Sequence, residues 1–293
     1  MKDVLSSPLT SFGGKYQACV EAELHKYIPI LTNNKQIYVE PFCGSCVMFF
    51  NVSCRTALLN DKYNLNWNFW HVISQKSLYD QFISEMQNVW IGSAWFTEYQ
   101  QRTDPVGKAI FFYLQNRSSH KGMQEDKYRY KFVNHPFEKD FSRWREKFDR
   151  LASLSVWDLD FRDVYQKLAK SESEYYTFTW YIDPPYFEED RYSLPFTEQD
   201  HRDLAEWNHN FADNPKHQLL ISYNDHPFIY ELYPKEKWHI KKLSWYQGSL
   251  NRDKTELLIS NRPIRKYDTT SSLMTYFGTK TEKPFTTFEE SEE

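Results

Sequence analysis

Short runs of β-branched and aromatic residues recur along the chain, and most are followed by apolar residues at helical spacing. Leu65, Phe69 and Val72, for example, fall on one face of a helix. We expect strands at residues 37–39, 57–59, 156–159, 178–182, 217–225 and 255–263. Strands that alternate with helices predict a parallel α/β sheet with helices on both faces.

Residues 63–150 interrupt this alternation with an aromatic, basic and mostly helical pattern. We interpret them as an insertion between the second and third strands that forms a small second domain. The main domain then consists of residues 1–62 and 151–278. The final residues, 279–293, are polar and acidic, and we expect them to be disordered.

Acidic residues stand where four of the expected strands end. They are Glu40, Asp61, Asp160 and Asp183. Ligands of open α/β sheets bind at the carboxyl ends of the strands. The sequence therefore predicts that these four acids share one rim of the sheet and face a ligand.

The stretch TWYIDPPYFEEDRY contains the most distinctive of these strand ends. Its prolines cannot donate to a strand ladder, and Asp183 before them is restricted to extended angles. The Asp183 carboxylate and the Pro184 carbonyl are thus two acceptors on a rigid backbone, with the flat faces of Tyr186 and Phe187 nearby. An ordinary strand-to-loop transition is the alternative for this stretch taken alone.

Composition narrows the class of protein. Of the 293 residues, 40% are hydrophobic and 18% aromatic, which is enough for a sizeable core. No apolar run reaches the ~20 residues of a membrane span, and the N-terminus lacks the apolar stretch of a signal peptide. With only four cysteines, we expect no disulfide scaffold, no membrane contact and a cytoplasmic protein.

Charge is unevenly distributed over a chain whose net charge is −4. Residues 102–150 hold 12 basic and 7 acidic residues, and residues 235–266 hold 9 and 3, so the two segments carry +5 and +6. Basic segments on an otherwise acidic chain are compatible with contacts to nucleic-acid phosphates. Solvated helix faces are the alternative.

The turn of residues 43–46 contains a glycine and two cysteines, which are weaker indications of a binding site. Gly44 follows a strand and permits close approach of a ligand to the backbone, and Asp61 at the next strand end is placed to bind a ribose diol. The chain has no GxGxxG motif, so we infer no NAD. Cys43 and Cys46 could form a redox pair or half a zinc site, but no matching second pair occurs, and we expect no metal.

Several of these motifs occur together in an order that resembles one family. Gly13-Gly14-Lys15, Glu40-Pro41-Phe42-Cys43-Gly44, Asp61, Asp160-Phe161 and Asp183-Pro184-Pro185-Tyr186 follow one another along the chain. This set is similar to the Dam-type adenine-N6 DNA methyltransferases, which use S-adenosylmethionine and release S-adenosylhomocysteine. The resemblance implies a Rossmann-like methyltransferase sheet with an inserted helical DNA-recognition domain, and residues 111–122 resemble the segment that leads into its DNA-contacting hairpin.

The resemblance also implies a role for each matching residue. Catalysis is assigned to Asp183, Pro184 and Tyr186. The cofactor site is assigned to Ser11, Phe12, Lys15, Glu40, Phe42, Gly44, Asp61, Asp160, Phe161 and Asp183. Contacts to double-stranded DNA are assigned to Asn116, Arg117, Ser118, His120, Lys121, Lys127 and Arg129. Such an enzyme flips the adenine out of the duplex, needs no metal, and in some cases has a cognate restriction endonuclease as partner.

Departures from the family pattern leave alternatives open. Cys46 replaces the second glycine of the family's FxGxG, where a side chain is expected to crowd the cofactor, and Ser11 occupies the place of an aromatic residue with Phe12 beside it. The hairpin differs from that of GATC-recognising members, so no recognition site is inferred. The alternatives are a methyltransferase acting on cytosine N4, RNA or a protein amide, a non-catalytic DNA-binding relative, and a zinc or redox protein.

Overall fold

The computed structural model describes residues 4–10, 13–89, 93–118, 138–170, 175–189, 194, 196–247 and 252–268. The strands are β1 (Gln36–Glu40), β2 (Thr56–Asn60), β3 (Ser153–Trp157), β4 (Thr177–Ile182), β5 (His217–Asn224), β6 (His239–Gln247) and β7 (Arg252–Ser260). The helices are α1 (Tyr16–Glu21), η1 (Leu24–Tyr27), α2 (Val47–Asn51), α3 (Asn64–Ser74), α4 (Lys76–Asn88), α5 (Ser93–Gln100), α6 (Pro105–Ser118), α7 (Ser142–Asp149), α8 (Phe161–Lys170), α9 (Glu198–Ala212) and α10 (Pro227–Leu232).

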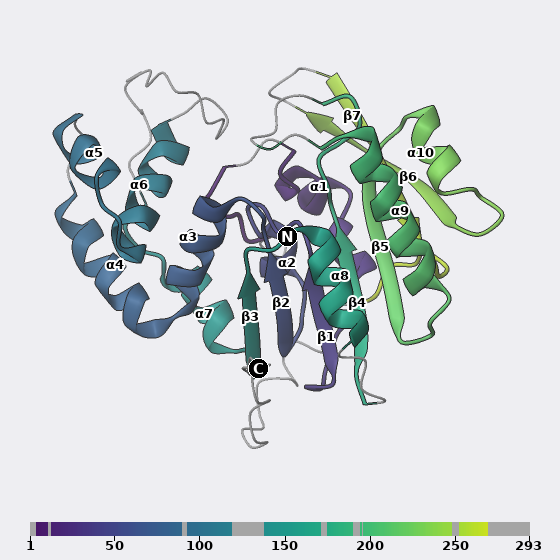
Figure 1. Cartoon of the computed structure of the whole chain (residues 1–293), viewed down its shortest axis with the longest axis horizontal. Helices are drawn as coiled ribbons and strands as arrows, with labels where there is room; N and C mark the ends of the chain where they lie inside the picture. Colours follow the sequence, from purple (N-terminus) through teal and green to yellow (C-terminus); the bar gives the residue numbers. More distant parts are fainter. Residues whose placement is uncertain are drawn as a thin grey trace.

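The strands form one seven-stranded sheet in the order β3-β2-β1-β4-β5-β7-β6 (Figure 1). The expected parallel arrangement is confirmed for β3, β2, β1, β4 and β5. The late strand β7 instead runs antiparallel to β5, and β6 pairs antiparallel with β7. Only residues 248–251 connect β6 to β7, and a connection this short permits only antiparallel pairing.

Two hydrophobic clusters cover the two faces of the sheet, so helices lie on both faces as expected. Along β1, Ile37 and Val39 pack on one face and Tyr38 on the other, which follows from the two-residue repeat of a strand. Helices α8, α9 and α10 bury their apolar side chains against the first face. Helices α1, α2 and α3 pack on the second face (Figure 1).

Helices α3 to α7 lie between β2 and β3 in the sequence and gather at the β3 edge of the sheet (Figure 1). The described part of residues 63–150 is helical, as the sequence predicts. Its buried residues, such as Phe69, Phe82 and Trp144, belong to the same cluster as Leu59 of the sheet. The insertion thus shares one core with the sheet, while its boundaries as a domain stay a prediction.

Two parts of the sequence interpretation lie outside the described residues. They are the expected hairpin after α6 and the acidic tail of residues 279–293. Within the described part of the chain, no helix is both long and apolar enough to cross a membrane.

The carboxyl ends of β1, β2 and β3 are tied together by one buried amide. Asn60 donates from Nδ2 to the carbonyl of Pro41 at 2.9 Å and to that of Leu159 at 3.0 Å. Its Oδ1 accepts from the Leu159 amide at 3.0 Å. This asparagine therefore sets the spacing of the three loops that leave the rim of the sheet.

Candidate active site

A cavity of about 340 Å³ opens at the carboxyl ends of β1, β2, β3 and β4. The four acids expected on this rim all line it: Glu40, Asp61, Asp160 and Asp183. The loop of residues 13–15 and helix α6 complete the wall. The expectation that these four acids share one rim is thus confirmed, because parallel strands bring their carboxyl ends to one edge of the sheet.

Gly44 and Asp61, which both line the cavity, are joined by a hydrogen bond. The Asp61 carboxylate accepts from the Gly44 amide at 2.9 Å, from the Tyr63 amide at 2.9 Å and from Asn66 Nδ2 at 2.6 Å. Burial raises the pKa of Asp61, and these hydrogen bonds oppose the increase. Gly44 has a φ of +47°, which glycine adopts without the cost that a side chain would add. The turn therefore holds one carboxylate in a fixed orientation.

Glu40 lies deeper, at the end of β1, and is almost fully buried. The Tyr38 hydroxyl donates to its Oε1 at 2.5 Å. Burial raises the pKa of Glu40 to about 8, so its neutral form prevails at pH 7. In that form it offers a hydroxyl donor as well as an acceptor to the cavity.

Three phenylalanine rings form an aromatic end of the cavity. The Phe42 ring lies 5.7 Å from the rings of both Phe161 and Phe196, and the latter two are 5.6 Å apart. Beside them, Lys62 Nζ donates to Asp160 Oδ2 at 2.7 Å and Arg162 NH1 to Oδ1 at 3.2 Å. Burial raises the pKa of Asp160, but these cations outweigh it and hold the pKa below its usual value.

Phe196 was not singled out from the sequence. It lies in the loop before α9, where nothing in the sequence connects it to Phe42 and Phe161. A Thr197 capping box with Asp200 starts α9 immediately after it. This capping box is the feature of the sequence from which the position of Phe196 could have been inferred, because it fixes where helix α9 begins.

Asp183 is held by a buried ammonium. Lys15 Nζ lies 2.7 Å from Asp183 Oδ2 and donates to the Gly13 carbonyl at 2.9 Å. Burial raises the pKa of Asp183, and the Lys15 charge works against that increase. The other oxygen, Oδ1, is buried and receives no hydrogen bond from any described residue. The following Pro184 and Tyr186 are buried as well, so the segment is firmly packed.

Comparison with known families identifies the chain. The model of the D12 class N6 adenine-specific DNA methyltransferases matches residues 11–244. The chain belongs to this family. It is a methyltransferase that acts on adenine N6 in DNA, and no curated protein matches it. The alternatives of cytosine, RNA or protein targets and of a non-catalytic relative gain no support from the comparison.

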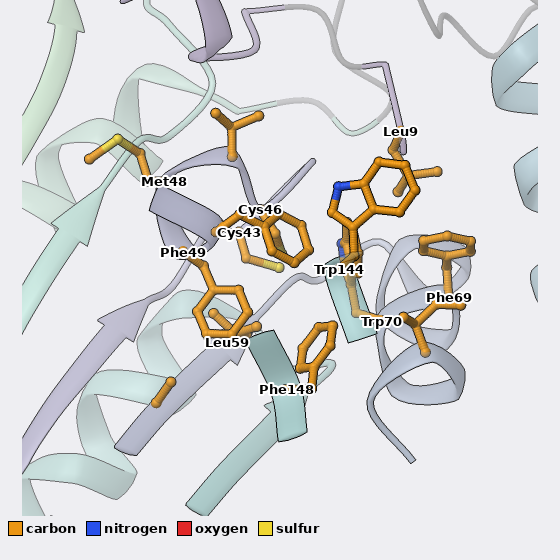
Figure 2. Packing of buried hydrophobic residues seen from close by; sticks show 14 of the residues in the cluster. Leu9, Cys43, Cys46, Met48, Phe49, Leu59, Phe69, Trp70, Trp144 and Phe148 are labelled. Atoms are coloured by element: carbon orange, nitrogen blue, oxygen red, sulfur yellow. The ribbon is translucent and has the colours of Figure 1, made fainter. Parts of the chain in front are cut away.

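Cys46 occupies the place of a glycine in the family pattern, and its backbone explains that preference. Its φ is 55°, in the left-handed region that glycine adopts most readily. Its side chain is buried among apolar residues that include Phe49 and Phe148 (Figure 2). It is not among the residues that line the cavity. The Cys46 side chain therefore takes up no space in the cavity itself, and the expected effect on the cofactor stays a prediction.

The zinc and redox alternative is also not supported by the geometry. Cys43 and Cys46 are free thiols, both buried. Burial raises the pKa of Cys43 to about 11, so its thiolate is strongly disfavoured. Within the described part of the chain, no group of His, Cys, Asp and Glu side chains is arranged to hold a metal ion.

Of the residues assigned to DNA, only three lie in the described part, all at the end of α6. Asn116 is buried, lines the cavity and bonds to the backbone of Thr10. Ser118 donates its hydroxyl to the Leu114 carbonyl at 2.7 Å, within its own helix. Arg117 reaches toward Thr10 Oγ1 at 3.5 Å. Their DNA contacts stay a prediction, which the engaged side chains of Asn116 and Ser118 do not favour.

The remaining assigned residues fall outside the described part of the chain. Two were assigned to the cofactor, Ser11 and Phe12. Four were assigned to DNA, namely His120, Lys121, Lys127 and Arg129.

Proposed function

We propose that the chain transfers a methyl group from S-adenosylmethionine to the amino group of a flipped-out adenine in double-stranded DNA, with Asp183 as the catalytic acceptor. One observation carries this proposal. Lys15 binds Oδ2 of Asp183, which leaves Oδ1 as a buried acceptor without a donor among the described residues. A buried acceptor of this kind favours a ligand that brings an N–H group.

The adenine amino group is a suitable donor for this site. Its lone pair is delocalised into the ring, which makes the nitrogen a poor nucleophile. Asp183 Oδ1 and the Pro184 carbonyl can each accept a hydrogen bond from one of its two N–H groups, which localises the lone pair on nitrogen, and the nitrogen loses one of these two protons when it gains the methyl group. Both acceptors are fixed on a proline-restricted backbone, so little reorganisation is needed during the reaction.

The cavity has the features that a methyl donor with an adenosine part requires. Its volume lies in the range of small-molecule sites. The ring cluster of Phe42, Phe161 and Phe196 offers faces on which a purine can stack. Asp61 retains acceptor capacity for a ribose hydroxyl beside its three internal hydrogen bonds. When bound, S-adenosylmethionine supplies a methyl group on a positively charged sulfur.

The residues that follow Asp183 are proposed to hold the target base. The buried Tyr186 ring packs near Tyr223, with ring centroids 6.2 Å apart, and it is proposed to stack on the base. A base cannot reach this depth from inside a duplex, so it must be flipped out. The basic insertion is proposed to hold the DNA, in which case affinity falls with salt by a log–log slope of about −0.9 per phosphate contact.

Methylation of mixed-sequence duplex DNA with labelled S-adenosylmethionine tests the proposal. Asp183→Asn keeps the shape of the side chain but weakens the acceptor, and it should reduce the rate by about 10²–10³-fold while the donor still binds. Asp213→Asn is the matched control, because Asp213 is exposed at the end of α9. Nucleoside analysis should find the label in N6-methyladenine.

Three outcomes would overturn the proposal. Label in N4-methylcytosine, RNA or protein would change the substrate. An Asp183→Asn variant as active as the wild type would remove Asp183 from catalysis. A wild-type protein that binds no S-adenosylmethionine would be a non-catalytic relative. A cognate restriction endonuclease as partner stays a prediction that none of these measurements addresses.

A further inference from the structure

Strand β7 places a further buried carboxylate beside the site. Glu256 Oε2 lies 3.8 Å from Lys15 Nζ, and the two side chains are 3% and 5% exposed. Glu256 lies beyond residues 11–244, the part of the chain that the family model matches. Burial of a charged side chain is costly unless it has a partner, so this arrangement requires an explanation.

Lys15 connects three separate segments through one ammonium group. It donates to the carbonyl of Gly13 at 2.9 Å, contacts Asp183 Oδ2 at 2.7 Å and faces Glu256 at 3.8 Å. The Gly13 and Asp183 oxygens lie within hydrogen-bond distance of the ammonium, and Glu256 at 3.8 Å adds a longer ion-pair contact on a further side. The position of Lys15, and with it the oxygen of Asp183 that it binds, thus depends on Glu256.

Lys254 holds the other oxygen of Glu256. Its ammonium forms an ion pair with Glu256 Oε1, on the same strand. The ammoniums of Lys15 and Lys254 also lie 5.0 Å and 5.3 Å from the centre of the Tyr186 ring. Glu256 therefore contacts both of the lysines whose ammonium groups lie over the ring of Tyr186.

We infer that Glu256 is a positioning residue for methyl transfer, which acts through Lys15 to fix Asp183 with Oδ2 occupied and Oδ1 directed to the target amine. This inference rests on the proposed role of Asp183. Without Glu256, the Lys15 ammonium has Asp183 as its single carboxylate partner among the described residues. Asp183 is then a weaker acceptor, and its orientation is less constrained.

The charges around Asp183 predict the direction in which its pKa changes when Glu256 is replaced. The groups that face Asp183 and Glu256 are Lys15 from the loop before α1, Cys19 from α1, Glu40 from β1, Tyr181 from β4 and Lys254 from β7. The neighbouring strands contribute neutral partners opposite Glu256, namely Asn224 of β5 and Leu243 of β6. After burial and Lys15, the Glu256 carboxylate is the next influence and raises the pKa of Asp183. Its removal lowers that pKa.

Glu256→Gln tests the inference, because it removes the charge and keeps the shape. Single-turnover rates on saturating DNA and donor should fall about 10- to 100-fold, and the acidic limb of the pH–rate profile should move to lower pH. Glu206→Gln, on the exposed side of α9, is the matched control with the same change in charge. A folded Glu256→Gln with the wild-type rate or the wild-type acidic limb would overturn the inference.

Two further variants guard against a purely structural effect. Glu256→Asp keeps the charge but withdraws it from Lys15, so it should retain the acidic limb and lose part of the rate. If Glu256→Gln does not fold, a wild-type rate in Glu256→Asp overturns the inference. Glu256→Gln should also cost less in a Lys15→Met background than alone, and additive losses would contradict action through Lys15.

Failure of this inference is distinguishable from failure of the proposed function. If the wild type methylates adenine and Asp183→Asn abolishes the reaction, the proposed function stands whatever Glu256→Gln does. If Asp183→Asn is active, the proposed function fails first, and the pH limb loses its assignment to Asp183.

Discussion

Asn116 and Thr10, 106 residues apart in the sequence, exchange two hydrogen bonds. Asn116 Oδ1 accepts from the Thr10 amide at 2.8 Å, and its Nδ2 donates to the Thr10 carbonyl at 2.7 Å. The amide thus takes the place of a strand neighbour for the N-terminal segment. Thr10 precedes the loop that carries Lys15, and Asn116 stands near the end of the helix that leads into the expected DNA hairpin. The pair joins the helical insertion to the segment that leads into the loop of Lys15.

We expect Asn116→Ala to loosen the N-terminal segment without unfolding the protein. Two partly buried hydrogen bonds are lost, which should lower the free energy of unfolding by about 1–3 kcal/mol. The segment keeps its other anchors, the Asn51 bonds to Leu5 and the Trp144 bond to Ser6. Faster hydrogen exchange at the Thr10 amide and a lower methyl-transfer rate would follow.

The control for this change is Asn88→Ala. Asn88 is exposed near the end of α4 and bonds only locally, to the Ser84 carbonyl at 3.1 Å. The Asn88→Ala change should leave hydrogen exchange at the Thr10 amide unchanged. An Asn116→Ala protein with wild-type exchange at Thr10 would show that the segment is held by its other anchors alone.

Cys46→Gly should leave affinity for S-adenosylmethionine within about twofold of the wild type. The side chain is buried in the core and does not line the cavity, so its removal changes no contact with a ligand. Relief of the φ of 55° partly offsets the lost packing. Titration calorimetry measures the affinity, and Asp61→Asn, at the cavity floor, is the variant that should weaken it. A tenfold gain in Cys46→Gly would mean that the thiol reaches the ligand after all.

Phe196→Ala should weaken donor binding by about tenfold. The ring completes the aromatic cluster with Phe42 and Phe161, and loss of an aromatic contact of this kind costs roughly 1 kcal/mol or more. Tyr175→Ala is a suitable comparison, because Tyr175 is 70% exposed and precedes the amino end of β4, whereas the cavity lies at the carboxyl end of that strand. Equal affinities in the two variants would contradict a purine-binding role of the cluster.

Much of the fold could be predicted from the sequence because β1, β2, β4 and β5 are largely buried strands rich in apolar residues, and the half-buried edge strand β3 still ends in the apolar pair Val156-Trp157. Strand β6 escaped prediction for a physical reason. It is an edge strand, and its sequence HIKKLSWYQ mixes lysines with apolar residues, as exposed edges do. The antiparallel direction of β7 follows from its short connection to β6, so missing one strand also hid the direction of the other.

The site was predictable only where residues follow a strand end in the sequence. Asp61 and Asp183 meet this condition, and both line the cavity. Glu256 does not, since it lies in the middle of β7 and contacts the site only through Lys15, which comes from a distant part of the sequence. Lys15 was expected at the cofactor, but no sequence pattern shows that its charge lies between two carboxylates. Contacts of this kind depend on tertiary packing.

Stability at alkaline pH should depend on Glu40. Its pKa in the folded protein is about 8, because burial disfavours its charge, whereas an unfolded glutamate has the ordinary value of 4.5. Since the folded pKa is raised, the associated stability is fully present below pH 4.5 and is lost as pH rises to about 8. The glutamine side chain of Glu40→Gln does not titrate in this pH range, so it contributes no such loss. The free energy of unfolding of this variant should exceed that of the wild type by about 1 kcal/mol or more at pH 8.5.

Urea unfolding of both proteins at pH 5 and pH 8.5 measures this difference. At pH 5, only half a unit above the unfolded pKa of 4.5, the wild type has lost only a small part of this stability, so the advantage of Glu40→Gln should be much smaller than at pH 8.5. Tyr38 keeps its hydrogen bond in either protein, because the glutamine amide offers an acceptor oxygen to the hydroxyl that now bonds Oε1. A difference that is the same at both pH values would instead indicate packing, and it would mean that Glu40 stays ionised inside the fold.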